Sequence, residues 1–158
     1  GIYNKKYIHE YIKGFYKEMA ENENFNEKIS LLIFDIDRFK TINDSYGHLT
    51  GDRVILKMCE TVRNSLAPDH IFARTGGVEF MICYKGTDKD ESCVKAEELM
   101  DLLKTTVIIS DGIEIVISIS GGLSSSTDEK VMCENDLISL ADQKLYRSKG
   151  MGRGCITY

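Results

Sequence analysis

Two aspartates at the end of an apolar run are the first residues whose spacing suggests chemistry. Asp35 and Asp37 follow the run Ile29–Phe34, which is typical of a strand buried on both faces. Side chains two positions apart on a strand project from the same face, and carboxylate oxygens are ligands that Mg²⁺ prefers. The pair is therefore a candidate magnesium site. A solvated strand end or a helix cap would use the same residue types.

A second polar cluster lies between residues 39 and 52. The amide of Asn43 both donates and accepts, and the carboxylate of Asp52 accepts twice, so together they have the groups needed to read the edge of a guanine. Lys40 can meet a phosphate as a point charge. Helix capping is the competing interpretation of Asn43 and Asp52.

Two glycine-rich turns hold the remaining candidates. Gly76 and Gly77 precede Val78, and paired glycines let the backbone approach a bound ligand closely. Lys149 and Arg153 flank a glycine-rich turn near the end of the chain, where two cations suit a triphosphate. An ordinary hairpin turn is the simpler explanation of the glycines, and attraction of cations to a helix C-terminus explains the other pair equally well.

The elements that must position these residues follow from hydrophobic periodicity. Helices are predicted over about 4–20, 38–45, 54–66 and 90–104, with a last one around 137–145. Strands are predicted over 29–34, 70–74, 78–84, 105–109, 113–120 and 155–158. Gly76-Gly77 and Asp111-Gly112 are hairpin signals. Hairpins mixed with crossover helices predict an α/β (α+β) fold, in which helices pack on an antiparallel or mixed sheet.

Bulk properties narrow the class of protein. The chain has 158 residues, enough for one domain, and a net charge of −5, which argues against nucleic acid or an anionic membrane as a partner. No apolar run is long enough to cross a bilayer. Five scattered cysteines form no zinc or disulfide pattern and suggest thiols in a reducing cytosol. Because the chain begins at Gly1, we expect a single domain excised from a longer signalling protein.

The order of these motifs resembles the GGDEF family of diguanylate cyclases over essentially the whole chain. The run from Phe34 to Asp52 is similar to the family's central segment almost residue for residue, and Gly76–Phe80 resembles its signature motif. Gly1–Asn4, Ser118–Gly121 and Ala141–Arg153 are similar to its opening, late-strand and closing motifs.

The resemblance implies a fold and a reaction. Family members have a five-stranded, mostly antiparallel sheet flanked by helices, similar to nucleotidyl cyclase and polymerase palm domains with a ferredoxin-like core. Active members condense two GTP into cyclic di-GMP and two diphosphates, with two domains facing each other and each holding GTP and Mg²⁺. The implied partners are thus GTP and a second copy of the domain, paired directly or through the upstream region. Nucleic acid binding and direct membrane insertion are not expected, and the implied location is cytoplasmic.

The resemblance also implies roles for individual residues. Asp35 and the backbone carbonyl of Ile36 would meet the metal, and Asp35 and Lys40 would belong to the catalytic set together with the position of Val78. Asp37 would support the site from behind, and Asp142 would be a structural ion-pair partner. The implied nucleotide-binding residues are Phe39, Asn43, Asp52, Gly76, Gly77, Lys149 and Arg153.

Val78 is the main departure from the family pattern. The signature reads G-G-[DE]-E-F, but here a valine stands where an acid normally meets the metal and assists the 3′-hydroxyl. Because successive strand residues alternate in direction, Glu79 is expected to face away from the metal and not to replace it. Loss of a positioned acid costs about 10²–10⁴-fold in rate, so we expect weak or absent cyclase activity.

Two smaller departures concern binding. Ala67 and His70 stand where many family members carry an R-x-x-D pair that binds cyclic di-GMP, so no inhibitory site is expected. Gly154 replaces the family's final asparagine, which weakens the phosphate-turn assignment slightly.

Three functions remain open on the sequence alone. The leading hypothesis is a degenerate domain that binds GTP and regulates a neighbouring domain. The second is an active cyclase, in which Asp37 or water compensates for Val78 or in which Val78 is an engineered change. The third is a non-catalytic dimerisation or protein-interaction module that no longer binds nucleotide.

Overall fold

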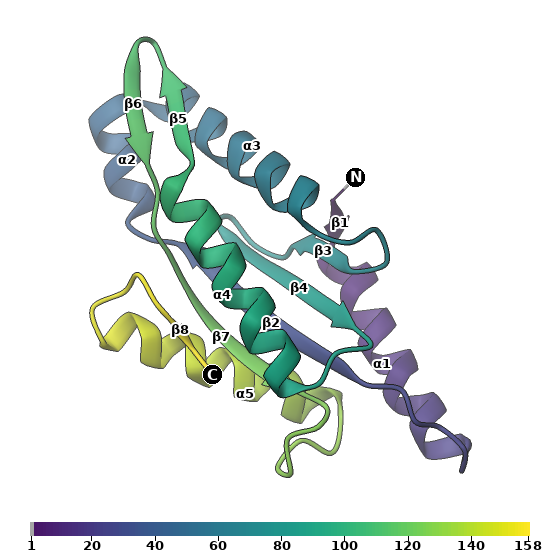
Figure 1. Cartoon of the computed structure of the whole chain (residues 1–158). Helices are drawn as coiled ribbons and strands as arrows, with labels where there is room; N and C mark the ends of the chain where they lie inside the picture. Colours follow the sequence, from purple (N-terminus) through teal and green to yellow (C-terminus); the bar gives the residue numbers. More distant parts are fainter. Residues whose placement is uncertain (1) are drawn as a thin grey trace.

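One six-stranded sheet, with helices on both faces, organises the computed structural model, which describes residues 2–158 (Figure 1). The strand order is β1-β3-β4-β2-β7-β8. The four central strands pair antiparallel, whereas β1 pairs with β3 and β8 with β7 in parallel. The strands are β1 (Tyr3–Asn4), β2 (Ile29–Ile36), β3 (Ile71–Arg74), β4 (Glu79–Lys85), β7 (Ile119–Ser125) and β8 (Ile156–Thr157). The predicted mostly antiparallel sheet flanked by helices is confirmed, with β1 as one short edge strand more than expected.

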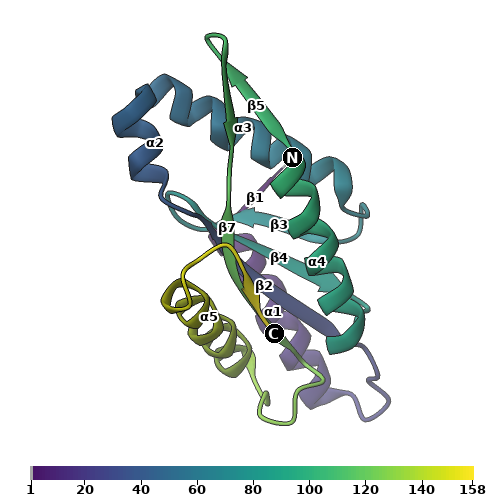
Figure 2. The same ribbon diagram turned by 60° about the vertical axis from the view of Figure 1, so that its left-hand side comes forward.

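Five helices surround the sheet: α1 (Lys5–Glu21), α2 (Phe39–Tyr46), α3 (His48–Ser65), α4 (Lys89–Thr105) and α5 (Glu134–Gly150). Helices α1 and α5 cover one face, while α3 and α4 cover the other (Figure 2). Alternate residues of β2 supply the two cores, because Leu31 and Ile33 pack toward α1 and α5 whereas Leu32 and Phe34 pack toward α3 and α4. The prediction of a central strand buried on both faces is therefore correct.

Local capping explains where several helices begin and end. The amide of Tyr7 donates to Asn4 Oδ1 at 2.9 Å, which fixes the start of α1, and Asp88 forms a capping box with Glu91 at the start of α4. Gly47, at φ +90°, ends α2 and directly precedes α3. Helix α3 therefore starts at His48, earlier than the apolar pattern from residue 54 predicted, because the chain turns at a single glycine.

The β5–β6 hairpin differs from the prediction. Strands β5 (Val107–Ser110) and β6 (Ile113–Val116) form a separate two-stranded sheet that projects past the end of α4 (Figure 1). Asp111 and Gly112 both have positive φ, as the predicted tight turn requires. The predicted single strand over 113–120 is instead divided between β6 and β7, since the chain leaves the hairpin after Val116 to pair with β2.

The remaining global expectations concern thiols and membranes. All five cysteines are free, in line with the predicted absence of a disulfide framework, and burial raises the pKa of the Cys83 thiol to about 12. Among residues 2–158, no helix combines the length and apolar character needed to span a bilayer.

Candidate functional site

Asp35 lies at the end of β2, on the sheet face covered by α1 and α5. Its Oδ2 forms an ion pair with Nζ of Lys149, which α5 carries in its last turn. Its Oδ1 is buried and has no hydrogen-bond partner among the described residues. Because a buried acceptor without a partner is costly, Asp35 keeps one oxygen available for a cation or a donor.

Asp37, two residues later, is fully engaged within the protein. Its carboxylate accepts hydrogen bonds from the hydroxyls of Ser118 and Ser120, both at 2.6 Å, and from the amide of Gly154 at 3.0 Å. These hydrogen bonds therefore connect the end of β2 to β7 and to the turn after α5. These bonds hold the segment after β2 in place and leave Asp37 little capacity to replace a missing ligand.

Gly154 takes part in these hydrogen bonds through its backbone amide. It has φ +64°, a conformation open to glycine and also one that asparagine tolerates better than most residues. Its amide donates to Asp37 and, at 3.1 Å, to Ser120. The missing asparagine therefore leaves the path of this turn intact.

The turn that carries Gly76 and Gly77 is wider than predicted. Strands β3 and β4 are paired from Arg74 opposite Phe80, so the connection extends beyond the two glycines, and neither glycine has positive φ. The predicted hairpin is present, but the predicted tight turn is wrong, because tight hairpin turns require left-handed backbone at one or both central positions. The guanidinium of Arg74 instead donates to the carbonyls of Gly76 and Gly77 and holds the loop. Both glycines are exposed, and a Cβ on Gly77 would meet no atom within 4 Å.

The register between β2 and β4 decides where the signature residues point. Asp35 is directly opposite Glu79, and opposite residues of an antiparallel pair share a face. Val78 instead packs against the core under α3 and α4. The alternation of Val78 and Glu79 is as predicted, but the expectation that Glu79 turns away is corrected, because Glu79 shares the face of Asp35. Glu79 Oε1 accepts from Thr75 Oγ1 at 2.9 Å.

The corner between α2 and α3 is built around a helix glycine. A Cβ on Gly51 would stand 1.9 Å from Asn43 Oδ1 and 3.1 Å from Cζ of Phe39, so both α2 side chains pack directly on its backbone. Asn43 Oδ1 is buried without a hydrogen-bond partner among the described residues. The side chain of Asn43 is therefore held in place against Gly51. Asp52 follows Gly51 on the exposed side of α3.

The predicted cations are only partly brought together. Lys149 reaches Asp35, but Lys40 is 89% exposed and pairs with Asp44 at 2.8 Å on its own helix. Arg153 lines a surface hollow with Arg38 and Thr41. Arg38, which the sequence analysis did not name as a candidate site residue, has φ 52° directly before α2. Its place directly after Asp37, within the run that resembles the family segment, could have identified it as a candidate.

Asp142 does not form the expected ion pair. No salt bridge involves it in the described part of the chain, where Lys149 pairs with Asp35 instead. Burial, followed by the charge of Asp35, raises the pKa of the Asp142 carboxyl, which Lys149 partly offsets. Asp142 therefore adds negative potential beside Asp35.

The fit of Mg²⁺ depends on Asp35 and the adjacent backbone. The amide of Ile36 donates to the carbonyl of Val78 at 3.3 Å, but between these two described residues the reciprocal bond to the Ile36 carbonyl is not formed. One carboxylate oxygen and one carbonyl are thus available, and both are donors that Mg²⁺ accepts. No cluster of three His, Cys, Asp or Glu side chains that could hold a metal occurs among residues 2–158. The residues fit a cation that takes its other ligands from substrate and water.

The chain is similar to several known proteins. The chain matches the family model described as "Diguanylate cyclase, GGDEF domain" over residues 1–155. It is 32% identical to the uncharacterised protein YhcK of Bacillus subtilis, covering 100% of this chain and 44% of that protein. It is 34% identical to diguanylate cyclase A of Treponema denticola, covering 83% and 35%. The GGDEF domain of DgcB from Caulobacter crescentus, solved with c-di-GMP, superposes with a TM-score of 0.86 at 27% identity, covering 99% and 90%. The chain spans less than half the length of these two curated relatives.

Proposed function

Since the chain belongs to the GGDEF domain family, we propose that it binds GTP between the α2–α3 corner and the end of β2, and converts it to cyclic di-GMP poorly or not at all. The observation that carries this proposal is the contrast between Asn43, whose buried Oδ1 is held against Gly51 without a hydrogen-bond partner, and Val78, whose side chain packs into the core.

Guanine binding is the better supported half of the proposal. Asn43 Oδ1 can accept from the guanine amino or imino group, and Asp52 adds a second acceptor on the next helix. An adenine presents a different pattern of donors on the same edge, so the site should prefer GTP to ATP. The preference is strong when buried polar groups would be left unpaired by the wrong ligand.

The phosphates would lie near the turn after α5 and the exposed glycine loop. Lys149 and Arg153 supply positive charge from α5 and its following turn, and Lys40 can leave its exposed pair with Asp44 at small cost. Gly76 and Gly77 leave room for a ligand to approach the backbone. Asp35 and the Ile36 carbonyl would hold Mg²⁺, which when bound neutralises charge on the triphosphate.

Turnover should be impaired because Val78 brings no oxygen to this cluster. An acid at this position would add a ligand and a proton acceptor, and its loss is expected to cost about 10²–10⁴-fold. Asp37 already accepts three hydrogen bonds within the protein, so it is poorly placed to substitute. Since the reaction joins two nucleotides, turnover also needs a second copy of the domain, so homodimerisation belongs to the proposal.

GTP binding and product formation test the two halves separately. Calorimetry with Mg²⁺ should detect GTP and not ATP, while chromatography of a dimeric preparation should find little or no cyclic di-GMP. Turnover equal to that of family members with the intact signature would refute the impairment. Absence of GTP binding at millimolar concentrations would instead favour a non-catalytic interaction module.

A slow but active cyclase is the second candidate, and the register favours it. Glu79 lies directly opposite Asp35 and would need only to exchange its bond with Thr75 for one to a metal-bound nucleotide. In that case Glu79→Gln should abolish the residual cyclic di-GMP formation. If Glu79→Gln leaves that rate unchanged, Glu79 does not replace the missing acid.

A further inference from the structure

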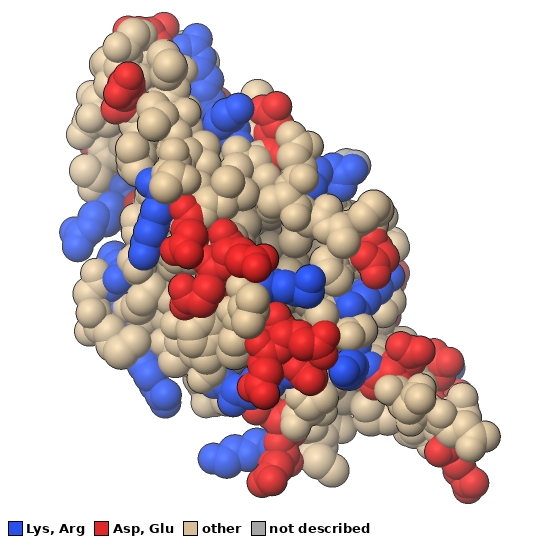
Figure 3. All heavy atoms as spheres, viewed as in Figure 1, with Lys and Arg blue, Asp and Glu red and all other residues tan. Residues whose placement is uncertain are grey.

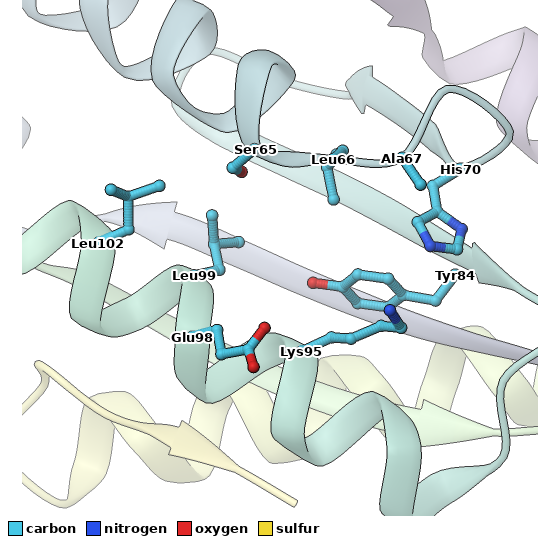
Figure 4. Close-up of a pocket in the computed structure, with 9 residues that line it drawn as sticks. All are labelled: Ser65, Leu66, Ala67, His70, Tyr84, Lys95, Glu98, Leu99 and Leu102. Carbon is cyan, nitrogen blue, oxygen red and sulfur yellow. The ribbon is translucent and has the colours of Figure 1, made fainter.

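A cavity lies between the C-terminal end of α3 and α4, on the face of the sheet opposite to Asp35. Its volume is about 160 Å³, and its walls combine apolar side chains, those of Leu66, Ala67, Leu99 and Leu102, with polar ones (Figure 4). None of its lining residues belongs to the nucleotide site, so the proposed function leaves the cavity unexplained.

The floor of the cavity carries a buried hydroxyl without a partner. Tyr84 on β4 is only 1% exposed, and its hydroxyl forms no hydrogen bond with any described residue. Figure 4 shows the phenol ring lying along the cavity, with the hydroxyl directed between α3 and α4 toward Leu99. A buried hydroxyl in apolar surroundings is costly unless something completes its hydrogen bond, so this position calls for a polar atom from outside the chain.

The neighbouring His70 is a neutral aromatic wall. Its ring packs edge-on against Tyr84, with 5.3 Å between centroids, and its Nδ1 accepts from the Lys85 amide at 3.1 Å. Burial lowers the pKa of His70, so the imidazole is uncharged at neutral pH. The cavity thus combines aliphatic side chains, two aromatic rings and one free hydroxyl.

Charge at the mouth disfavours anions. Lys95 and Glu98 flank the opening, and acidic side chains gather over the exposed side of α4 (Figure 3). These exposed acids of α4 are Asp90, Glu91, Glu97, Glu98 and Asp101. An anionic ligand would meet this negative surface and then lose its hydration against leucine side chains, which is unfavourable on both counts.

We propose that this cavity binds a neutral molecule with a single aromatic ring and one hydrogen-bonding group, which completes the hydrogen bond of Tyr84. An apolar cavity of about 150 Å³ in another protein holds benzene, so the space here suits one ring with a small substituent. The site is independent of GTP, and its failure would leave the proposed function unaffected.

Phenol and toluene, which have similar shapes, test the proposal on the intact chain by NMR titration. Phenol should perturb resonances of Leu66, Leu99 and Tyr84 with an affinity of about millimolar. Tyr84→Phe keeps the ring but removes the hydroxyl, so the ratio of phenol to toluene affinity should fall about fivefold. The free energy of transferring each probe out of water is the same for the wild type and Tyr84→Phe, so it cancels when their affinity ratios are compared. An unchanged ratio, or perturbations confined to other regions, would overturn the proposal.

A cavity-filling variant provides a second test. Ala67 is exposed at its outer side, so Ala67→Phe should preserve the fold while its ring occupies the cavity and blocks both probes. Ala20→Phe makes the same change at an exposed position on α1 and should bind both as the wild type does. Melting curves of both variants check folding. If Ala67→Phe binds phenol like the wild type, or if the wild type binds neither probe and holds only water, the proposal is wrong.

Discussion

The α2–α3 corner and the β3–β4 hairpin lie at the same end of the sheet but differ in how much of a nucleotide site each provides. At the corner, Asn43 is fixed against Gly51, and its buried Oδ1 has no hydrogen-bond partner among the described residues. At the hairpin, the glycine loop is held by Arg74, but Val78 packs into the core and offers no oxygen. Under the proposed function, recognition and chemistry would be carried by separate elements, so one could be lost while the other is kept.

Restoring an acid at the hairpin should have the largest effect on this contrast. Val78→Glu is expected to raise cyclic di-GMP formation by at least about 10²-fold, because it returns a metal ligand and proton acceptor. The measurement is product formation by chromatography from Mg²⁺ and GTP.

Val78→Gln is the matched control, because it has the shape and polarity of glutamate without its charge. It should leave the rate near that of the wild type. If Val78→Glu also remains inactive while GTP still binds, the hairpin is not the element that limits turnover, and the comparison between the two regions fails.

Disturbing the corner should give the next largest effect, this time on binding. In Gly51→Ala the new Cβ would stand 1.9 Å from Asn43 Oδ1, so the amide must move away. We expect GTP affinity to fall at least about tenfold and stability to fall by about 1–3 kcal/mol. Calorimetry and urea unfolding measure the two quantities.

Two further variants separate the corner effect from a general cost of adding a methyl group to a helix. Gly14 lies within α1 with no atom within 4 Å of a built Cβ, so Gly14→Ala should stabilise by up to about 1 kcal/mol without changing GTP affinity. In the Asn43→Ala background, Gly51→Ala should cost little further affinity, since the displaced amide is already gone. Additive losses would contradict the bracing role of Gly51.

Local sequence patterns predicted most of the fold. The apolar run of β2, the helical spacing of α5 and the Asp111-Gly112 turn depend on neighbours along the chain, and all three appear as expected. The division of the predicted strand over 113–120 was not visible locally, because it depends on which partner each half pairs with.

The site was less predictable because its geometry depends on residues far apart in sequence. Alternation along β4 separated Val78 from Glu79, but only the register with β2 assigns Glu79 to the face of Asp35. Strand alternation did not distinguish the two aspartates, which only the family resemblance separated. In the structure, Asp37 is set apart by serine donors 81 and 83 residues away. The contact of Gly51 with Asn43 likewise becomes visible only when α2 and α3 are packed.

The smallest expected effect concerns Asp37. This test distinguishes a residue that supports the structure of the site from one that binds the metal. Asp37→Asn keeps the shape but turns an acceptor for Ser120 into a donor, so we expect unfolding in urea to reveal a loss of about 1–3 kcal/mol. The loss should be the same with and without Mg²⁺, because the three protein donors already occupy this carboxylate. Asp44→Asn makes the same substitution at an exposed residue that pairs with Lys40 and should cost less than about 0.5 kcal/mol. If the loss in Asp37→Asn appeared only with Mg²⁺, Asp37 would be a metal ligand, and the assignment of the metal-binding carboxylate to Asp35 would be wrong.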